Sequence, residues 1–195
     1  MLRWICNPRI WGFERIPLEG PLIVAANHAS YLDPILLGAL IPREIHFMAQ
    51  HRLFWGPLGW LIRKYNAFPV RRGEADLSAL RHAIGVLRQG GALLIFPEGT
   101  RGTGEELLEA RKGIGFLATR TGAPVLPVLL NGTHRVLGRQ HRWIHRAQVD
   151  ILIGRPMRFE RDREPEAVAQ AVRKVLAQLR AEKESLALDS VRWLG

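Results

Sequence analysis

The stretch PLIVAANHASYLDP, residues 21–34, decides the fold. Its first seven residues form a nearly continuous apolar run, which predicts a strand buried on both faces. Asp33-Pro34 then has the pattern of a helix start. His28 therefore falls at the carboxyl end of a buried strand, where open α/β sheets usually place their ligands.

His28 and Asp33 are separated by four residues, as His-x4-Asp. A turn of this length can return the Asp33 carboxylate to one imidazole nitrogen, which fixes the tautomer and leaves the other nitrogen free to take a proton. The pair is therefore predicted to be a general base with its orienting carboxylate.

Simpler interpretations of this turn stay open. Asp33 is a good helix N-cap whatever else it does, and a lone histidine beside a strand is more often structural than catalytic. One His and one Asp are too few ligands for a zinc site, so no metal is expected. Ser30 as a nucleophile is disfavoured because there is no nucleophile elbow, and its hydroxyl fits better as a cap for the following helix.

A second polar motif follows another predicted strand, residues 92–96 (ALLIF). The chain turns through Pro97 and Gly99, and glycine lets backbone N–H groups approach a ligand closely. Thr100 offers a hydroxyl and Arg101 a planar fork suited to phosphate oxygens. Glu98 would repel a phosphate, so we expect it to hold a basic side chain or a substrate hydroxyl. An ordinary polar turn is the alternative.

The rest of the chain alternates strands and helices, which favours an α/β layer fold. We expect strands at residues 45–48, 67–70, 125–130 and 149–153, and helices at 75–89, 111–121 and, at the C-terminus, within 165–188. No linker or repeat interrupts the pattern. The prediction is one domain, residues 1–195, with a mixed or mostly parallel central sheet flanked by helices.

The chain has 195 residues and a formal net charge of +10, which favours an anionic partner. Arginine excess can also reflect genome composition. Nucleic acid is the weakest of the anionic partners because no groove-reading motif is present. The single cysteine, Cys6, excludes an intramolecular disulfide and is typical of a reducing compartment.

No apolar run approaches the roughly 20 residues needed to span a bilayer, and the N-terminus does not resemble a secretory signal. Residues 53–62 are rich in Trp and flanked by basic residues, which is typical of an interfacial segment. Trp4 and Trp11 make residues 1–16 a second candidate membrane contact. Core packing of Trp55 and Trp60 is the alternative. The basic stretch 134–146 is interpreted first as a solvated loop.

These motifs resemble those of the 1-acyl-sn-glycerol-3-phosphate (lysophosphatidic acid) acyltransferases, within the glycerolipid acyltransferase superfamily. Residues 27–33 match the first block of that family, 68–72 the second, 96–101 the third and 125–128 the fourth, so the likeness covers residues 17–154. Asn66 and Arg71 depart from the second block, where glycine and an acid are common. The long apolar N-terminal helices of many members are also missing.

The resemblance implies a glycerol-phosphate acyltransferase-like fold and an enzyme of phospholipid synthesis that makes phosphatidic acid. His28 would deprotonate the free hydroxyl of lysophosphatidic acid, and Asp33 would orient His28. Acceptor-binding residues would be Arg72, Glu98, Gly99, Thr100 and Arg101, and Lys112, beside Arg111, is a further candidate. Acyl-CoA or acyl-carrier protein would be the co-substrate, with no cofactor. Residues 125–128 would be structural and line the acyl chain.

The predicted location is peripheral, at the cytoplasmic face of an anionic membrane. Within the same class, the acceptor could instead be glycerol 3-phosphate, a lysophospholipid or a lyso-aminolipid. Outside it, the alternatives are a non-catalytic basic domain that binds lipid or nucleic acid, and a lipid hydrolase that uses Ser30.

Overall fold

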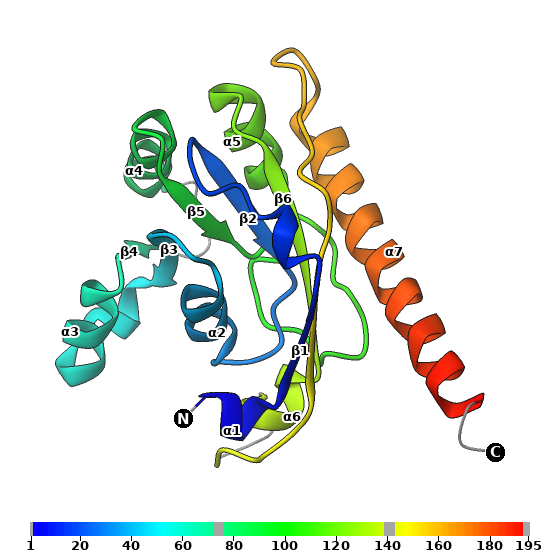
Figure 1. The fold of residues 1–195 in the computed structure, drawn as a ribbon. Coiled ribbons are helices and arrows are strands. Elements are labelled where there is room, and N and C mark those ends of the chain that lie inside the picture. Colours follow the sequence, from blue (N-terminus) through cyan, green and yellow to red (C-terminus); the bar gives the residue numbers. More distant parts are fainter. Residues whose placement is uncertain (1, 72–75, 139–142, 193–195) are drawn as a thin grey trace.

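A seven-stranded sheet forms the centre of the molecule, in the order β1-β7-β6-β2-β5-β3-β4 (Figure 1). The computed structural model describes residues 2–71, 76–138 and 143–192. Adjacent strands are parallel except β6 and β7, which are antiparallel. The strands are β1 (Pro8–Trp11), β2 (Leu22–Ala26), β3 (Ile45–Gln50), β4 (Ala67–Val70), β5 (Ala92–Ile95), β6 (Val125–Asn131) and β7 (Val149–Ile153).

Helices cover both faces of the sheet, so the predicted α/β fold is confirmed. One face packs against α1 (Leu2–Cys6), α2 (Asp33–Leu40) and α6 (Thr133–Leu137). The other packs against α4 (Leu77–Arg88), α5 (Gly113–Thr121) and α7 (Pro165–Arg192). Successive side chains of β2 alternate between these two cores, and all five are fully buried. A strand buried on both faces needs the continuous apolar run seen in its sequence.

Three helix boundaries differ from the prediction. The α4 helix begins at Leu77 because the Asp76 carboxylate caps it, accepting from the backbone N–H of Ser78 and Ala79. The α5 helix begins at Gly113, and Arg111 lies in the preceding turn, where its N–H donates to Pro97 O. The α7 helix extends to Arg192, beyond the expected limit at residue 188.

The N-terminal segment contains two elements that the sequence did not predict, α1 and β1. The β1 strand adds to the edge of the sheet, parallel to β7, and Arg9 forms an ion pair of 2.7 Å with Asp150. Proline at the first position, Pro8, is compatible with an edge strand but hides the strand from pattern analysis. Residues 8–11 are therefore part of the sheet.

The Trp-rich stretch folds as a 3-10 turn, η2 (His51–Phe54), and helix α3 (Gly56–Lys64), beyond the β3 and β4 end of the sheet (Figure 1). A second 3-10 turn, η1 (Phe13–Arg15), follows β1. The basic stretch contains α6, although residues 139–142 lie outside the described part. Within residues 2–71, 76–138 and 143–192, no helix combines the length and hydropathy needed to cross a membrane.

Candidate active site

His28 and Asp33 form a hydrogen-bonded pair at the carboxyl end of β2. Nδ1 of His28 lies 2.8 Å from Oδ2 of Asp33. The same oxygen accepts from the backbone N–H groups of Ala29 and Ser30, at 2.7 and 2.8 Å. Because a carboxylate oxygen accepts, Nδ1 must donate, and Nε2 keeps a free lone pair.

Asp33 is fully buried and does not act as the N-cap of α2. The helix begins at Asp33 itself with Leu32 as N-cap, and no side chain caps it. The carboxylate turns back onto the loop at residues 28–30 instead. The N-cap interpretation is therefore wrong: Oδ2 bonds His28, Ala29 and Ser30, and Oδ1 is buried without a hydrogen-bond partner among the described residues.

The Ser30 hydroxyl is hydrogen-bonded to backbone groups on both sides. It donates to Leu137 O at 2.8 Å and accepts from Leu32 N–H at 3.1 Å, and the residue is fully buried. Ser30 was expected to cap α2, but no side chain caps this helix, and its bond with Leu32 stabilises the turn before the helix instead. A buried hydroxyl with both bonds made is a poor nucleophile, so the structure does not support a Ser30 hydrolase.

Two neighbours hold the His28 loop from either side. The Asn27 side chain exchanges two hydrogen bonds with the backbone of Leu130, at 2.9 and 2.7 Å, and so ties the end of β2 to β6. The Phe96 ring stacks on the His28 imidazole, with centroids 4.0 Å apart and planes at 18°. His28 can therefore rotate little, because one nitrogen is bonded and one ring face is covered.

Glu98 is buried beside the His28 loop, and its Oε1 accepts from the backbone N–H of His28, with 3.4 Å between the nitrogen and the oxygen. Burial raises the pKa of Glu98 to about 7, although bonds from the backbone N–H groups of His28 and Leu108 offset part of the rise. Its contacts are thus with the loops, whereas the resemblance implied contact with the acceptor.

The loop after the second motif is fastened to the first motif and to α7. The N–H of Gly102 donates to His28 O at 2.8 Å. From α7, Nε of Arg173 donates to Leu108 O at 3.2 Å, and Arg180 bonds the carbonyl of Glu105. The C-terminal helix therefore braces the loop that carries Gly102 and Leu108.

Gly99 lies in a left-handed turn with φ of +66°. A Cβ on Gly99 would lie 2.8 Å from Nε of Arg111, so the backbone turn and this guanidinium are in close approach. Thr100 follows, half-buried. The structure thus brings Arg111 to the motif, whereas the sequence named it only as the neighbour of Lys112.

The guanidinium of Arg101 lies over the Tyr31 ring, with Cζ 3.5 Å from the ring centroid. Tyr31 belongs to the first motif, so this cation–π contact joins the two motifs. Among the described residues, Nη1 of Arg101 is buried and has no hydrogen-bond partner. This geometry leaves donor capacity on the guanidinium for an anion.

Arg72 and Lys112 were also predicted to bind the acceptor. Arg72 lies outside the described residues. Lys112 is the residue before α5, is exposed, and lines a cavity together with Gly99 and Arg111.

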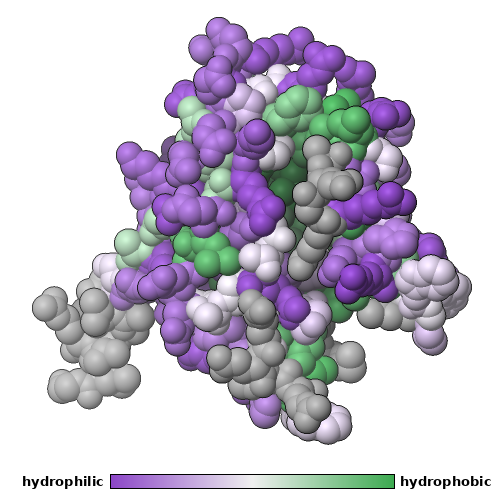
Figure 2. Space-filling view, turned by 180° about the vertical axis from the view of Figure 1, so that it is seen from behind, coloured by the Kyte–Doolittle hydropathy of each residue, from purple (hydrophilic) through white to green (hydrophobic). Residues whose placement is uncertain are grey.

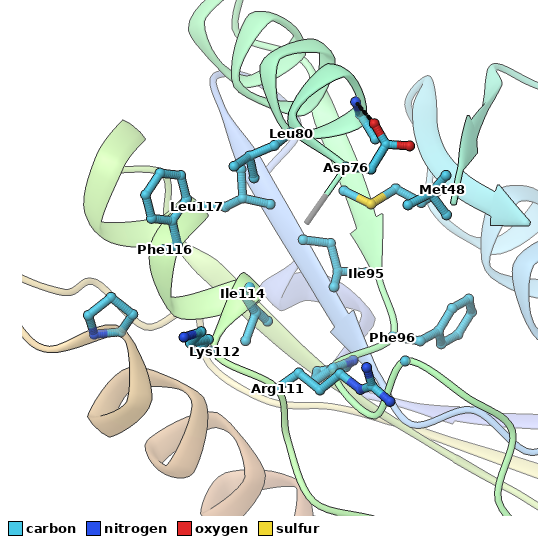
Figure 3. Close-up of a pocket in the computed structure, with 16 residues that line it drawn as sticks. Met48, Asp76, Leu80, Ile95, Phe96, Arg111, Lys112, Ile114, Phe116 and Leu117 are labelled. Carbon is cyan, nitrogen blue, oxygen red and sulfur yellow. Dashed lines mark hydrogen bonds between the residues drawn. The ribbon is translucent and has the colours of Figure 1, made fainter. Parts of the chain in front are cut away.

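This cavity has a volume of about 540 Å³ and lies between the sheet, α4 and α5, within the range of about 300–1,000 Å³ typical of ligand pockets. Apolar side chains such as Ile95, Ile114 and Leu117 surround it, and Arg111 and Lys112 lie toward one end (Figure 3). In Figure 2, apolar side chains gather in a hollow with a hydrophilic rim.

Residues 125–128, expected to line the acyl chain, are fully buried in the middle of the sheet and do not line this cavity. Its strand contributions come from Met48 of β3, Val70 of β4 and Ile95 of β5. Asp76 is its acidic residue. Hydrogen bonds, first that from the backbone of Arg71 and then those from Ser78 and Ala79, hold the pKa of Asp76 well below its usual range.

The described residues contain no group of three or more His, Cys, Asp or Glu that could bind a metal ion.

Residues 7–131 match the Acyltransferase family, so the chain belongs to that family, and the His28–Asp33 pair fits its His-x4-Asp motif. The protein is an acyltransferase enzyme. Its relatives include the 1-acyl-sn-glycerol-3-phosphate acyltransferase of Bacillus subtilis, 29% identical over 76% of this chain and 73% of that protein.

A solved structure has a similar fold: the 1-acyl-sn-glycerophosphate (LPA) acyltransferase PlsC from Thermotoga maritima, with a TM-score of 0.75 and 30% identity over 91% of this chain and 74% of that one. The lyso-ornithine lipid O-acyltransferase of Pseudomonas aeruginosa is 37% identical, over 57% of this chain and 43% of that protein. For several other relatives the match covers about half of their length; for the Streptococcus pneumoniae 1-acyl-sn-glycerol-3-phosphate acyltransferase it is 56%.

Sequence reasoning did not find the roles of Asn27, Phe96 and Tyr31, although all three lie within the quoted motifs. It missed Arg180 altogether. None of the four carries a local signal, since the partner of each is distant in the chain: Arg101 for Tyr31, His28 for Phe96, Leu130 for Asn27 and Glu105 for Arg180.

Proposed function

We propose that the protein transfers a fatty acyl group from a thioester to the free hydroxyl of lysophosphatidic acid, giving phosphatidic acid. The observation that carries the proposal is the His28–Asp33 pair, whose Nε2 is left free, near an arginine with unused donor capacity. The relatives that act on 1-acyl-sn-glycerol 3-phosphate support it.

In the proposed mechanism, Nε2 of His28 removes the proton from the acceptor hydroxyl as its oxygen attacks the thioester carbonyl. Asp33 stabilises the resulting imidazolium through Nδ1. The tetrahedral intermediate then collapses, the C–S bond breaks, and the imidazolium returns the proton to the leaving thiolate. The ester and free thiol are the products, and the donor is acyl-CoA or acyl-carrier protein.

For the substrates, we propose that Arg101, with Arg111, Lys112 and Arg72, binds the acceptor phosphate. The apolar cavity accepts an acyl chain, because its walls are apolar and its cationic residues lie toward one end. Glu98 serves by holding the His28 loop through backbone bonds. The acceptor carries an acyl chain, so the reaction takes place at a membrane, with the protein peripheral at its cytoplasmic face.

The test is to incubate purified protein with labelled acyl-CoA or acyl-carrier protein and lysophosphatidic acid. Wild type should form phosphatidic acid, and His28→Ala should form none. His82→Ala, an exposed histidine on α4, is the matched control and should keep activity. Product from His28→Ala at the wild-type rate would exclude His28 as the base.

Arg101→Ala tests the phosphate assignment. Loss of a charge-assisted hydrogen bond is worth about 1.5–3 kcal/mol, so KM for lysophosphatidic acid should rise about 10- to 100-fold. Arg81→Ala, which removes an exposed arginine from α4, should leave KM unchanged. An equal rise with a lyso-lipid that lacks a phosphate would contradict the assignment.

A lyso-aminolipid is the second candidate acceptor, favoured by the 37% identity to the lyso-ornithine lipid enzyme. A panel of lyso-lipids and glycerol 3-phosphate, compared by kcat/KM, decides between them.

A further inference from the structure

The outer side of α3 is apolar and exposed. Trp55 is 76% exposed and Trp60 is 60% exposed, and Leu61 and Tyr65 are exposed as well. On a helix, residues 60, 61, 64 and 65 share one side. The α3 surface is defined here as Trp55, Trp60, Leu61, Arg63, Lys64 and Tyr65.

The inner side of α3 is fixed against η2. Phe54 is buried with Ala49 and Ala67, and Ile62 packs against them. A Cβ on Gly59 would lie 2.2 Å from the backbone carbonyl carbon of Phe54, so the helix touches the turn through backbone atoms. The orientation of the exposed aromatic side is therefore set by close packing.

The two charged residues of the α3 surface itself, Arg63 and Lys64, are both positive. Nζ of Lys64 lies 4.0 Å from the Trp60 ring centroid, and Arg63 is exposed, with its Cζ 5.3 Å from the Phe54 ring centroid. The sequence contains no Asp or Glu between Glu44 and Glu74. Exposed Trp combined with Lys and Arg and without acids fits the interfacial region of an anionic bilayer, where Trp is enriched and cations are attracted.

The α3 surface begins at the carboxyl edge of the sheet, where the candidate active site lies, with Trp55 after η2, and α3 then runs back to the amino end of β4, where Asn66 bonds Glu44. The η2 turn and α3 follow the carboxyl end of β3, which runs parallel to β5, and β5 runs parallel to β2, which ends before His28. Figure 1 shows α3 beside the β3 and β4 end of the sheet. Met48 and Val70, from the strands on either side of α3, line the apolar cavity.

We propose that the α3 surface docks the protein on an anionic lipid bilayer, with Trp55 and Trp60 inserted at headgroup level and Arg63 and Lys64 against the anionic lipids. The value of this docking for catalysis rests on the proposed function, because the Trp55 end of the surface lies on the side of the sheet that carries His28, where a membrane-held acceptor would have to arrive. The binding itself does not depend on the reaction.

Co-sedimentation with vesicles tests the proposal. The full chain is mixed with vesicles of equal parts phosphatidylglycerol and phosphatidylcholine, or of phosphatidylcholine alone. The double variant Trp55→Ser/Trp60→Ser should bind the mixed vesicles at least about tenfold more weakly than wild type, because removing two interfacial aromatics costs more than 1.4 kcal/mol. Leu18→Ser is the matched control: Leu18 is 64% exposed and precedes β2, at the opposite edge, and the variant should bind as wild type does.

A second double variant removes the two positive charges of the α3 surface. Arg63→Ser/Lys64→Ser should lose about tenfold or more in affinity for the mixed vesicles and almost nothing for phosphatidylcholine alone. Arg88→Ser, an exposed arginine at the end of α4 and the amino edge of the sheet, should have no effect.

His28→Ala separates the docking from the reaction and should bind vesicles as wild type does. If no substrate is turned over and the Trp variant still loses vesicle binding, the proposed function fails and the docking surface stands. Wild type that does not sediment with either vesicle, or a Trp variant that binds unchanged, overturns the docking. The docking is also overturned if sedimentation velocity shows that the Trp residues mediate self-association and the Trp variant keeps its vesicle binding. A third contrary result is a Trp variant that is weaker only in its use of acyl-carrier protein.

Discussion

One carboxylate oxygen of Asp33 both bonds His28 and holds the turn that presents it. Oδ2 lies 2.8 Å from Nδ1 of His28 and also accepts from the backbone N–H groups of Ala29 and Ser30. The loop geometry and the tautomer of the imidazole therefore depend on the same atom, and substitutions of Asp33 can separate the two roles.

Asp33→Asn should keep the loop but lose the reaction. An amide oxygen can accept from the same N–H groups, whereas the negative charge that stabilises the imidazolium is gone, so kcat should fall about 10²- to 10⁴-fold with little change in Tm. Asp33→Ala should lose both activity and stability. Circular dichroism melts measure the stability of both variants, and initial rates measure their activity. An Asn variant with wild-type kcat would contradict the role of the charge.

Glu98→Gln should change how stability depends on pH. Folding raises the pKa of Glu98 from 4.5 to about 7, so between these values the folded state binds more protons than the unfolded state. Wild-type stability therefore loses a contribution on the order of 3 kcal/mol as the pH rises from about 4.5 to about 7. The Gln variant should lack this loss and be relatively more stable at pH 8. Urea unfolding at pH 5 and pH 8 measures it, and an identical pH slope in both proteins would exclude the raised pKa.

Gly115→Ala should destabilise the contact between α5 and α7. A Cβ there would lie 1.9 Å from Pro165 O, a backbone atom that cannot move aside cheaply. Overpacking of this kind costs about 1–3 kcal/mol, which corresponds to a decrease in Tm of roughly 2–10 °C. The control is Gly113→Ala in the same helix, where nothing lies within 4 Å, and it should be neutral or stabilising. Equal melting temperatures for the two variants would show that α7 is not packed as described.

Ala79→Leu should shorten the acyl chain that the enzyme prefers. Ala79 is buried on α4 and lines the cavity, so three added carbons occupy its volume. Activity should fall at least about tenfold for long-chain donors relative to short ones, since displacing a few methylenes from an apolar site is worth about 1–3 kcal/mol. Arg81→Leu, exposed on the same helix, should leave the profile unchanged. A competition assay with mixed donors measures the ratio, and an unchanged Ala79→Leu profile would mean that the chain lies elsewhere.

Local patterns predicted most of the central fold. All five residues of β2 are apolar because both faces of the strand are covered, and this run predicted a buried strand. The spacing of apolar residues in α4 likewise predicted a helix from the local sequence alone. The edge strand β1 was missed. It has little apolar pattern, and it forms because β7, far along the chain, supplies its hydrogen bonds.

The candidate site also has one part that the local sequence predicted and one part that it did not. His28 and Asp33 are five residues apart, so a single turn could be expected to join them. Glu98 is 70 residues from His28, and the sequence suggested that it would hold a basic side chain or a substrate hydroxyl. Its burial, and the backbone groups that it bonds, follow from the placement of β5 beside β2.

By itself, the sequence determined the order of the main strands and helices, the local His-x4-Asp pair and the positive charge, since these depend on neighbours along the chain. Only the tertiary structure decided which glycine of α5 is indispensable to packing, that Trp55 and Trp60 face outward, and that α7 braces the loop beside His28. Each of these depends on atoms that become neighbours only when distant segments pack, and no local pattern records that proximity.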